Sequence, residues 1–313
     1  MPKPLLLVVI PFAPERLEGL DAHFEIVWWK ALPDATGFLA ERGAQVQVLL
    51  TSGAAGLPAG SRDHLTELRL IACNGVGYDA IDMAWARAEG IHVTNTPDVL
   101  SADVADLALA LLLGVFRQIP AADRFVREGA WASGPLPLGR RLGGSRVGIL
   151  GLGNIGQRIA HRCAAFDTEV AYTGRHRKPD TAYAYFDSPR ALAGWADVLI
   201  AATPGGAATR HLVSAEVLDA LGPRGVFVNI ARGSVVDEPA LVARLADGRL
   251  AGAGLDVFAD EPRVPAALLG LPQVVLSPHI ASATHETRQA MAEIVVTNIR
   301  AFAEGAGLPT PIA

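Results

Sequence analysis

The chain has 313 residues, of which half are hydrophobic and 19% are charged, and its formal net charge is -5. This length corresponds to about two domains of ordinary size, and the composition excludes a globally disordered, collagen-like or disulfide-rich protein. The negative charge argues against nucleic acid as a partner bound through a basic surface.

The two cysteines, Cys73 and Cys163, lie in apolar segments far apart in sequence, which favours a reducing compartment over disulfide formation. Near the N-terminus, Pro11 ends six apolar residues and charged residues follow at once, so we expect a buried strand there rather than a signal peptide. The longest apolar run, 104–116, contains an aspartate and is too short to span a bilayer. These features predict a cytoplasmic protein with no membrane partner.

Short runs rich in Val, Ile and Leu alternate with longer helical patterns, which predicts βαβ units and mostly parallel sheets. A first series of strands is expected near 5–10, 24–28, 45–50, 69–73 and 91–94. A second series is expected to begin near 146, 169, 197, 226, 253 and 273. Six strands in that second series are typical of a doubly wound nucleotide-binding domain.

Between the two series we expect one helix from Ser101 to Ile119, stopped by Pro120. Its apolar residues cover most of its circumference, which predicts burial between domains or between subunits. The segment 129–144 is rich in Gly, Pro and Leu, and an interaction arm and an ordinary surface connection are equally open there. A last helix is expected over 284–304, and the tail beyond it is expected to return to the first domain.

A glycine-rich turn directly follows the strand that begins near 146. Residues 146–156 are RVGILGLGNIG, and a helical pattern continues from there. In such a turn Gly151 makes the tight bend, Gly153 lets the backbone approach a pyrophosphate, and Gly156 lets the helix pack closely on the strand. The helix N-terminus adds amide donors and a positive dipole. The pattern predicts dinucleotide binding, with a glycine-rich turn in another kind of α/β protein as the alternative.

The residues after the next strand distinguish NAD from NADP. An NAD enzyme usually has an acid there, about 20 residues beyond the turn, which binds the ribose 2′-hydroxyl. Here the strand EVAYT is followed by Gly174, Arg175, His176, Arg177 and Lys178, with no acid. Because arginine forms strong charge-assisted bonds with phosphate, the sequence favours NADPH over NADH. A solvated basic turn is the alternative.

Three side chains suited to acid–base or anion-binding chemistry follow later strands, at the edge where ligands bind in an open α/β sheet. Arg232 lies in VFVNIARGSVVDEPAL, Glu261 in GLDVFADEP and His279 in VVLSPHIASAT. An arginine in this position can bind an anion with two hydrogen bonds. Spacing alone does not place Glu261 beside His279. The histidines and cysteines show no metal-ligand spacing, so no metal is expected.

Four motifs resemble, in order, those of the D-isomer-specific 2-hydroxyacid dehydrogenase family: GLGNIG, NIARGSVVDEPAL, AGAGLDVFADEP and SPHIASAT. The resemblance covers essentially the whole chain. Within the family, TGRHRK and IASATHETRQAM resemble the NADPH-dependent glyoxylate/hydroxypyruvate reductases. The segment NTPDVLSADVADLALALLL and the run around EPRVP also resemble the hydroxyphenylpyruvate reductase branch.

The resemblance implies an α/β protein with two doubly wound, Rossmann-like or flavodoxin-like, parallel-sheet domains and an active-site cleft between them. It implies that Arg232 binds the substrate carboxylate, and that His279 protonates the carbonyl oxygen as the nicotinamide delivers hydride. Glu261 would hold the imidazole in its charged form. The main chain at Val76 and Gly77 would bind the carboxylate, with a plain strand-to-helix turn as the alternative.

The resemblance also implies a set of cofactor contacts and a homodimer formed through the cofactor domains. Asp256 is expected near the nicotinamide carboxamide. The apolar helix from Ser101 and the segment after Gly129 are consistent with the dimer. The full set of expected cofactor-binding residues is Gly151, Gly153, Asn154, Ile155, Gly156, Arg175, Arg177, Lys178, Thr203, Pro204, Ile230, Ala231 and Asp256.

We therefore predict an NADPH-dependent reductase of small 2-keto acids, with glyoxylate and hydroxypyruvate as leading substrates. Phenylpyruvate-type acids and 2-ketogluconate stay open, because RVPAALLGLP replaces a common His-Pro-Leu segment and because Asn74 and Tyr78 stand at variable family positions. A dinucleotide-sensing scaffold similar to corepressors is the alternative from another class. We expect the substrate domain over 1–96 and 285–313, and the dinucleotide-binding domain over 97–284.

Overall fold

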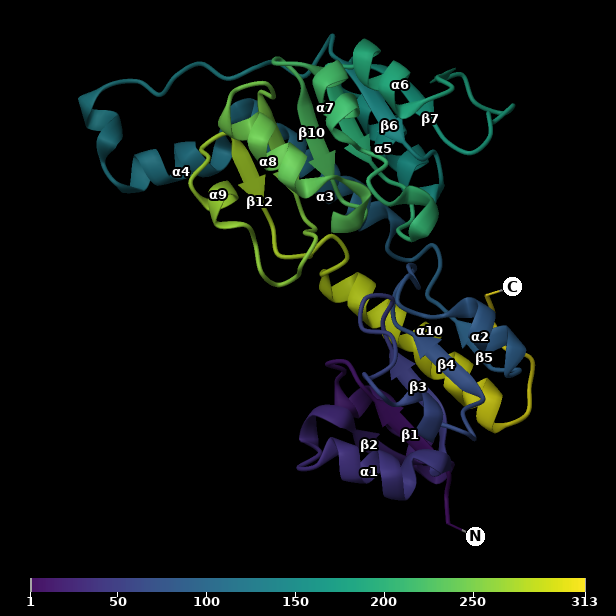
Figure 1. Cartoon of the computed structure of the whole chain (residues 1–313). Coiled ribbons are helices and arrows are strands. Elements are labelled where there is room, and N and C mark those ends of the chain that lie inside the picture. The colour runs from purple at the N-terminus through teal and green to yellow at the C-terminus, as the bar shows by residue number, and fades with distance from the viewer. Residues whose placement is uncertain (1, 313) are drawn as a thin grey trace. The chain divides into compact units, whose positions relative to one another are not determined.

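The computed structural model describes residues 2–312, and the chain divides into two compact units. One unit contains the stretch that ends at Leu100 together with the stretch that begins at Thr284, and the other is the continuous stretch Ser101–Ala283. The boundaries expected from the sequence, 96/97 and 284/285, fall close to this division. Figure 1 shows each unit as a sheet with helices packed against it.

The discontinuous unit is built on a five-stranded parallel sheet in the order β2-β1-β3-β4-β5, the flavodoxin-like arrangement. Its strands confirm the first predicted series: β1 (Leu5–Val8), β2 (Glu25–Trp28), β3 (Val46–Thr51), β4 (Leu70–Cys73) and β5 (His92–Thr94). Along β1, Leu5 and Leu7 join one buried cluster and Leu6 and Val8 join another. Both faces of the sheet are therefore covered, as expected for parallel strands.

Helices α1 (Ala35–Arg42) and α2 (Met83–Ala88) contribute to the first of these clusters, and α10 (His285–Ala303) contributes to the second. In Figure 1 α10 runs along the sheet beside β4. The tail after α10 then returns to β5, where the Ile312 N–H donates to the Val93 carbonyl at 2.8 Å. The predicted return of the tail to the first domain is thus confirmed.

The continuous unit contains a seven-stranded parallel sheet in the order β12-β11-β10-β9-β6-β7-β8. Starting from β8, this is the doubly wound 3-2-1-4-5-6 order with one strand added. Six strands confirm the second predicted series, and the two-residue β8 was not predicted. The strands are β6 (Arg146–Leu150), β7 (Glu169–Thr173), β8 (Ala184–Tyr185), β9 (Val198–Ala201), β10 (Val226–Asn229), β11 (Gly252–Leu255) and β12 (Val274–Leu276).

Further α-helices and several short 3-10 helices complete the chain. The remaining helices of the continuous unit are α3 (Ser101–Arg117), α4 (Ile119–Arg127), α5 (Asn154–Ala164), α6 (Pro189–Trp195), α7 (Ala215–Leu221), α8 (Glu238–Ala246) and α9 (Ala266–Leu269). Short 3-10 helices lie at Pro14–Leu17, Leu20–Ala22, Trp29–Ala31, Gly43–Gln45, Arg62–His64, Ala130–Ser133, Ala207–Thr209 and Gly233–Val235.

The apolar helix predicted from Ser101 packs on the sheet of its own unit. α3 contacts α5, β10, β11 and β12. Glycines in β11 permit this close contact, because a Cβ added to Gly254 would lie 2.8 Å from the Leu111 side chain. Its additional burial between domains or subunits stays a prediction.

The end of this helix differs from the prediction. The helix stops at Arg117 because Gln118 adopts a left-handed conformation with φ of 54°. Pro120 does not stop a helix but lies in the first turn of α4, where its missing N–H costs nothing. In residues 2–312 no single helix has the length and apolarity to cross a membrane; only α3 and α4 taken together, with a 61° bend, meet these criteria.

Candidate active site and cofactor site

The glycine-rich turn joins β6 to α5, and two of its glycines are required by the fold itself. Gly151 has a φ of 93°, and its N–H donates to the Thr173 carbonyl at 2.9 Å. A Cβ on Gly156 would overlap the Gly151 carbonyl, so only glycine lets α5 begin this close to the turn. Gly153 differs, because a Cβ there would meet nothing within 4 Å. The turn is therefore open on the side of Gly153, where a pyrophosphate would approach.

Main-chain donors point out of the same turn. Within residues 2–312, the N–H groups of Leu152 and Gly153 have no hydrogen-bond acceptor, and α5 begins at the next residue, Asn154. Backbone amides at a helix N-terminus, with the positive end of the helix dipole, form a binding site for phosphate. The residues present fit the pyrophosphate of a dinucleotide.

The turn after β7 carries the cations that the sequence singled out. The Lys178 N–H donates to the Tyr172 hydroxyl at 2.7 Å, which folds the turn back onto the strand end. Arg175, Arg177 and Lys178 are exposed, and no ion pair within residues 2–312 includes any of them. Three cations without a carboxylate partner at the end of the second strand of the fold fit a 2′-phosphate better than a 2′-hydroxyl.

The residues after β9 border the glycine-rich turn, and β10 ends in a buried polar residue. Thr203 lies against Gly151, whose added Cβ would be 3.1 Å from the Thr203 Cα, and Pro204 follows it. After β10, the fully buried Asn229 accepts a hydrogen bond from the Ala231 N–H at 3.1 Å and donates to the Arg232 carbonyl at 3.0 Å. Sequence analysis did not single out Asn229. Its signal is a polar residue at the end of an otherwise apolar strand.

Arg232 is held in place by its neighbour in sequence. A Cβ on Gly233 would overlap the Phe258 carbonyl group, so a glycine at this position lets the Arg232 loop press against the segment after β11. The Arg232 side chain is partly buried, and its Nη1 donates to the Ala231 carbonyl at 2.7 Å. The same segment after β11 carries Glu261, so the two loops bring these charges near each other.

Glu261 and His279 are in direct contact. The Nδ1 atom of His279 lies 2.7 Å from Oε2 of Glu261, and the other carboxylate oxygen accepts the Phe258 N–H at 3.0 Å. Burial raises the pKa of Glu261, but hydrogen bonds from His279 and Phe258 and the charges of His279 and Arg232 outweigh it, so the net pKa is lowered. The carboxylate is therefore ionised at neutral pH, and it orients the imidazole with Nε2 directed away from it.

The loop that carries His279 is held by Asp256, which is completely buried at the end of β11. Its Oδ1 accepts the Ser277 hydroxyl at 2.6 Å and the Ile280 N–H at 2.9 Å, and its Oδ2 accepts the Ala281 N–H at 3.0 Å. The His279 N–H donates to the Asp256 carbonyl at 2.8 Å. Asp256 thus binds the chain on both sides of His279. The sequence predicted only a cofactor contact for Asp256, not this positioning role.

In the discontinuous unit, the loop after β4 shows the main-chain arrangement expected of an anion site. The carbonyl groups of Gly75, Val76 and Gly77 accept hydrogen bonds from Thr96, Asn95 and Cys73, respectively. The N–H groups of Val76 and Gly77 have no acceptor within residues 2–312. Two consecutive amides without an acceptor, next to carbonyl groups that are already bonded, are available as donors for an anion.

Metal-dependent catalysis and catalysis by a cysteine nucleophile have less support in the structure. No group of three or more His, Cys, Asp or Glu side chains within residues 2–312 is arranged to hold a metal ion. Both cysteines are buried, and burial raises the pKa of the Cys163 thiol to about 12, so this thiol is not a nucleophile at neutral pH.

Comparison with known proteins identifies the family. Residues 109–281 match the model of the NAD-binding domain of D-isomer specific 2-hydroxyacid dehydrogenases. The chain belongs to this family. It is therefore an oxidoreductase with an NAD(P)-binding domain, and its family reduces 2-keto acids to 2-hydroxy acids. The resemblance and the fold class inferred from the motifs are both confirmed.

Individual relatives cover nearly the whole chain. It is 44% identical over 307 residues to a hydroxyphenylpyruvate reductase of Plectranthus scutellarioides, with 98% of each chain covered. It is 44% identical over 310 residues to a 2-ketogluconate reductase of Gluconobacter oxydans, with 99% of each chain covered. The structure of an NADPH-dependent glyoxylate/hydroxypyruvate reductase from Sinorhizobium meliloti, in complex with NADP and malonate, superposes with a TM-score of 0.91 at 41% identity, covering 99% of this chain and 97% of that one.

Proposed function

We propose that this protein uses NADPH to reduce small 2-keto acids to D-2-hydroxy acids, with glyoxylate and hydroxypyruvate as leading substrates. The observation that carries the proposal is the 2.7 Å contact between His279 and the ionised Glu261, with the charge of Arg232 close by. An oriented imidazole beside a guanidinium is the pair of groups that reduction of a keto acid requires, one to supply a proton and one to hold the carboxylate.

Each of the three side chains has a distinct part in the reaction. A nicotinamide dinucleotide held by the turn Gly151–Gly156 would supply the hydride for the keto carbon. Nε2 of His279 donates the proton to the carbonyl oxygen, and Glu261 orients the imidazole ring and balances its charge. Arg232 binds the substrate carboxylate and polarises the keto group. In the discontinuous unit, the free amides of Val76 and Gly77 are donors for a substrate carboxylate.

The preference for NADPH is supported by the exposed, unpaired cations Arg175, Arg177 and Lys178 after β7. The NADP-bound relative from Sinorhizobium meliloti, described as NADPH-dependent, supports it independently. The proposed pyrophosphate site is the turn Gly151–Gly156 with the first residues of α5, Asn154 and Ile155. The remaining proposed cofactor contacts are Thr203, Pro204, Ile230, Ala231 and Asp256.

Two other substrate classes are supported by relatives of equal similarity. The hydroxyphenylpyruvate reductase of Plectranthus scutellarioides favours aromatic 2-keto acids, and the 2-ketogluconate reductase of Gluconobacter oxydans favours sugar-derived ones. The alternative of a dinucleotide-sensing scaffold has less support, because the relatives that match nearly the whole chain are named reductases.

The test is the value of kcat/KM for glyoxylate, hydroxypyruvate, phenylpyruvate and 2-ketogluconate, each with NADPH and with NADH. We expect turnover, and a kcat/KM at least tenfold higher with NADPH. In the same assay His279→Ala should lose about 100-fold or more of kcat, the usual worth of a general acid, while the Kd for NADPH stays within about threefold. Tight NADPH binding with no turnover across the panel would instead favour the scaffold.

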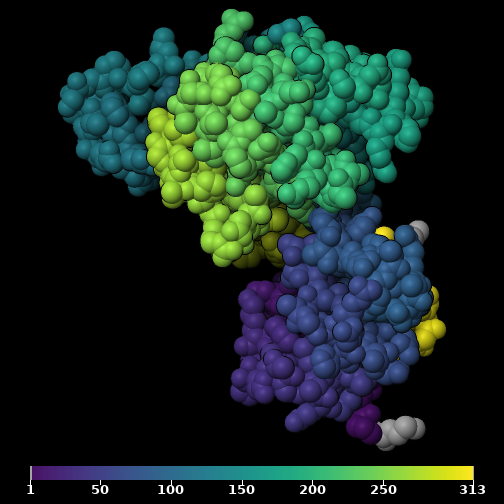
Figure 2. Space-filling model, in the orientation of Figure 1, coloured from purple at the N-terminus to yellow at the C-terminus, as the bar shows by residue number. Residues whose placement is uncertain are grey.

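We also propose that the protein is a cytoplasmic homodimer that associates through its cofactor-binding unit. Large apolar side chains are exposed on α4 and on the segment after it: Ile119, Val126, Trp131 and Leu138. Figure 2 shows this part of the chain standing out from the body of its unit. Such a group of exposed apolar side chains is typical of a surface that is covered by a partner.

A further inference from the structure

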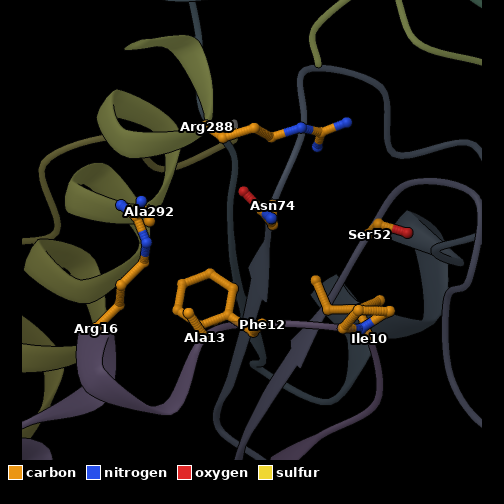
Figure 3. Close-up of a pocket in the computed structure, with 9 residues that line it drawn as sticks. Ile10, Phe12, Ala13, Arg16, Ser52, Asn74, Arg288 and Ala292 are labelled. Atoms are coloured by element: carbon orange, nitrogen blue, oxygen red, sulfur yellow. The ribbon is translucent and has the colours of Figure 1, made fainter. Parts of the chain in front are cut away.

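The discontinuous unit contains a cavity of about 480 Å³ that none of the roles above uses (Figure 3). It lies where β1, β3 and β4 end, beneath the start of α10. The side chains of its wall that matter here are Ile10, Phe12, Arg16, Ser52, Asn74 and Arg288. The volume falls within the range of about 300–1,000 Å³ that is typical of small-molecule sites.

The cavity adjoins the loop proposed to bind the substrate carboxylate. Asn74 lines the cavity and is also the first residue of that loop. Ser52 lines it as well, and the next residue, Gly53, packs so closely on the loop that an added Cβ would overlap the Gly77 carbonyl. A substrate whose carboxylate is bound by the amides of Val76 and Gly77 would therefore have this cavity beside it, within the same unit.

The polar groups of the cavity have unused hydrogen-bonding capacity of both kinds. Arg16 and Arg288 are exposed, and within residues 2–312 neither side chain takes part in an ion pair or hydrogen bond. The Ser52 hydroxyl accepts the Ala55 N–H at 3.2 Å, which leaves its own proton free to be donated. By contrast, the Oδ1 atom of Asn74 is a buried acceptor that has no donor among residues 2–312.

This combination specifies the chemistry of the occupant. Arginine and serine donors require acceptors, whereas the Asn74 oxygen requires a donor, because a buried acceptor without a partner costs about 1–3 kcal/mol. A hydroxyl group is both donor and acceptor, but a carboxylate is only an acceptor and would face the Asn74 oxygen unfavourably. Figure 3 shows the ring of Phe12 and the side chain of Ile10 on the wall opposite Arg288, where they can pack on the C–H groups of a carbon chain.

We infer that this cavity binds the substrate's carbon chain beyond the keto group and selects a hydroxylated chain, as in a sugar-derived 2-keto acid. Arg288, Arg16 and Asn74 are then specificity-determining residues. The inference rests on the proposed function and sharpens it: glyoxylate leaves the cavity unused, hydroxypyruvate fills its near end with one hydroxyl, and a polyhydroxylated acid such as 2-ketogluconate uses its full length.

The test measures kcat/KM with NADPH for two matched pairs of acids, hydroxypyruvate against pyruvate and 2-ketogluconate against 2-ketohexanoate. Each pair has one carbon chain with and without hydroxyl groups. We expect the hydroxylated member of each pair to be preferred at least tenfold. In Arg288→Met and Arg16→Met the preference should fall about tenfold, since each loses a charged donor but keeps a chain that fills space.

The matched control is Arg300→Met, which removes an exposed arginine from the same helix outside the cavity and should keep the wild-type preference. Equal kcat/KM within both pairs would overturn the inference, and so would a preference that neither cavity variant changes. A preference for 2-ketoglutarate over 2-ketogluconate would also overturn it, in favour of a second carboxylate. If glyoxylate is reduced in these cases the proposed function survives; if no 2-keto acid is turned over, the proposed function itself fails.

Discussion

His279 has a left-handed backbone conformation, with φ of 53°, which is rare for any residue with a side chain and costs on the order of 1–2 kcal/mol. The surrounding hydrogen bonds offset this cost. Asp256 holds Ser277, Ile280 and Ala281 through its carboxylate, and its carbonyl accepts the His279 N–H. His279 is therefore positioned by a buried aspartate side chain, Asp256.

We predict that Asp256→Asn lowers kcat by about ten- to hundredfold. One of the carboxylate oxygens becomes an NH₂ group that must face a main-chain N–H, so the loop loses charge-assisted bonds each worth about 1.5–3 kcal/mol and His279 is no longer held. Steady-state rates with NADPH and the leading 2-keto acids measure this. Asp180→Asn, in an exposed turn, is the control and should behave as wild type. An unchanged kcat in Asp256→Asn would contradict the positioning role.

For single residues, the sequence predicted candidate side chains for the site but not the contacts that hold them. Arg232, Glu261 and His279 were recognisable from their motifs. Their contacts depend on residues of the same motifs to which the sequence assigned no role, such as Asn229 and the main chain of Phe258. The contact of Glu261 with His279 joins residues 18 positions apart, and it arises because β11 and β12 are neighbours in the sheet. Spacing along the chain does not contain that information.

Among the elements, strands were predicted more accurately than helix ends. Parallel strands buried on both faces are short continuous apolar runs, which stand out in any sequence. The break between α3 and α4 does not, because Gln118 takes a left-handed conformation without being a glycine or an asparagine. The two-residue β8 is too short for a hydrophobic period to reveal.

An ion pair where β6 and β9 begin reinforces their pairing: Arg146 is the first residue of β6, and Asp197 directly precedes β9. Asp197 accepts the Arg146 N–H at 2.9 Å and its guanidinium nitrogens at 3.2 and 3.3 Å. Burial raises the pKa of Asp197, but the hydrogen bonds and charge of Arg146 outweigh it and the net pKa is lowered. The same contact raises the pKa of Arg146, chiefly through the side-chain hydrogen bond.

We predict that Asp197→Asn lowers the free energy of unfolding by about 1 kcal/mol at pH 7, a modest value because Arg146 is 42% exposed and solvent screens the pair. A carboxylate whose pKa is lowered by folding stabilises the protein above its unfolded pKa of about 3.9, and this stability is lost as pH falls through the lower folded pKa. The difference between wild type and variant should therefore be constant from pH 6 to 8 and shrink progressively as the pH falls below the unfolded pKa of about 3.9.

Urea unfolding at a series of pH values measures this difference. Asp260→Asn is the matched control, because Asp260 also pairs with an arginine, Arg263, but only three residues away and in full contact with solvent. It should leave the unfolding midpoint unchanged. A destabilisation of Asp197→Asn that is the same at pH 3 as at pH 7 would show that the charge of Asp197 is not its cause.

For the whole molecule, the net charge of -5 argues against a nucleic-acid partner, yet it conceals local groups of cations. Arg175, Arg177 and Lys178 follow one another after β7 and are visible in the sequence, whereas Arg16 and Arg288 are brought to one cavity only by the fold. The sequence predicts the oligomeric state only through the family resemblance, and not from composition or charge.

The dimer can be tested through the apolar side chains exposed beyond α4. Trp131 is 68% exposed and Leu138 is 96% exposed, and burying such groups against a partner contributes about 25 cal/mol for each Å² removed from water. We predict that light scattering at micromolar concentration gives twice the chain mass of 32.8 kDa for the wild type. Trp131→Ser combined with Leu138→Ser should raise the dissociation constant about tenfold or more.

The matched control for the dimer is Leu269→Ser on α9, because Leu269 is exposed to nearly the same degree as Trp131, at 66%, but lies outside the segment after α4. It should leave the dimer intact. A monomeric wild type would refute the proposed dimer. A dimer that resists the Trp131 and Leu138 changes but dissociates in Leu269→Ser would instead place the interface on α9, because loss of a buried apolar contact weakens only the surface to which it belongs.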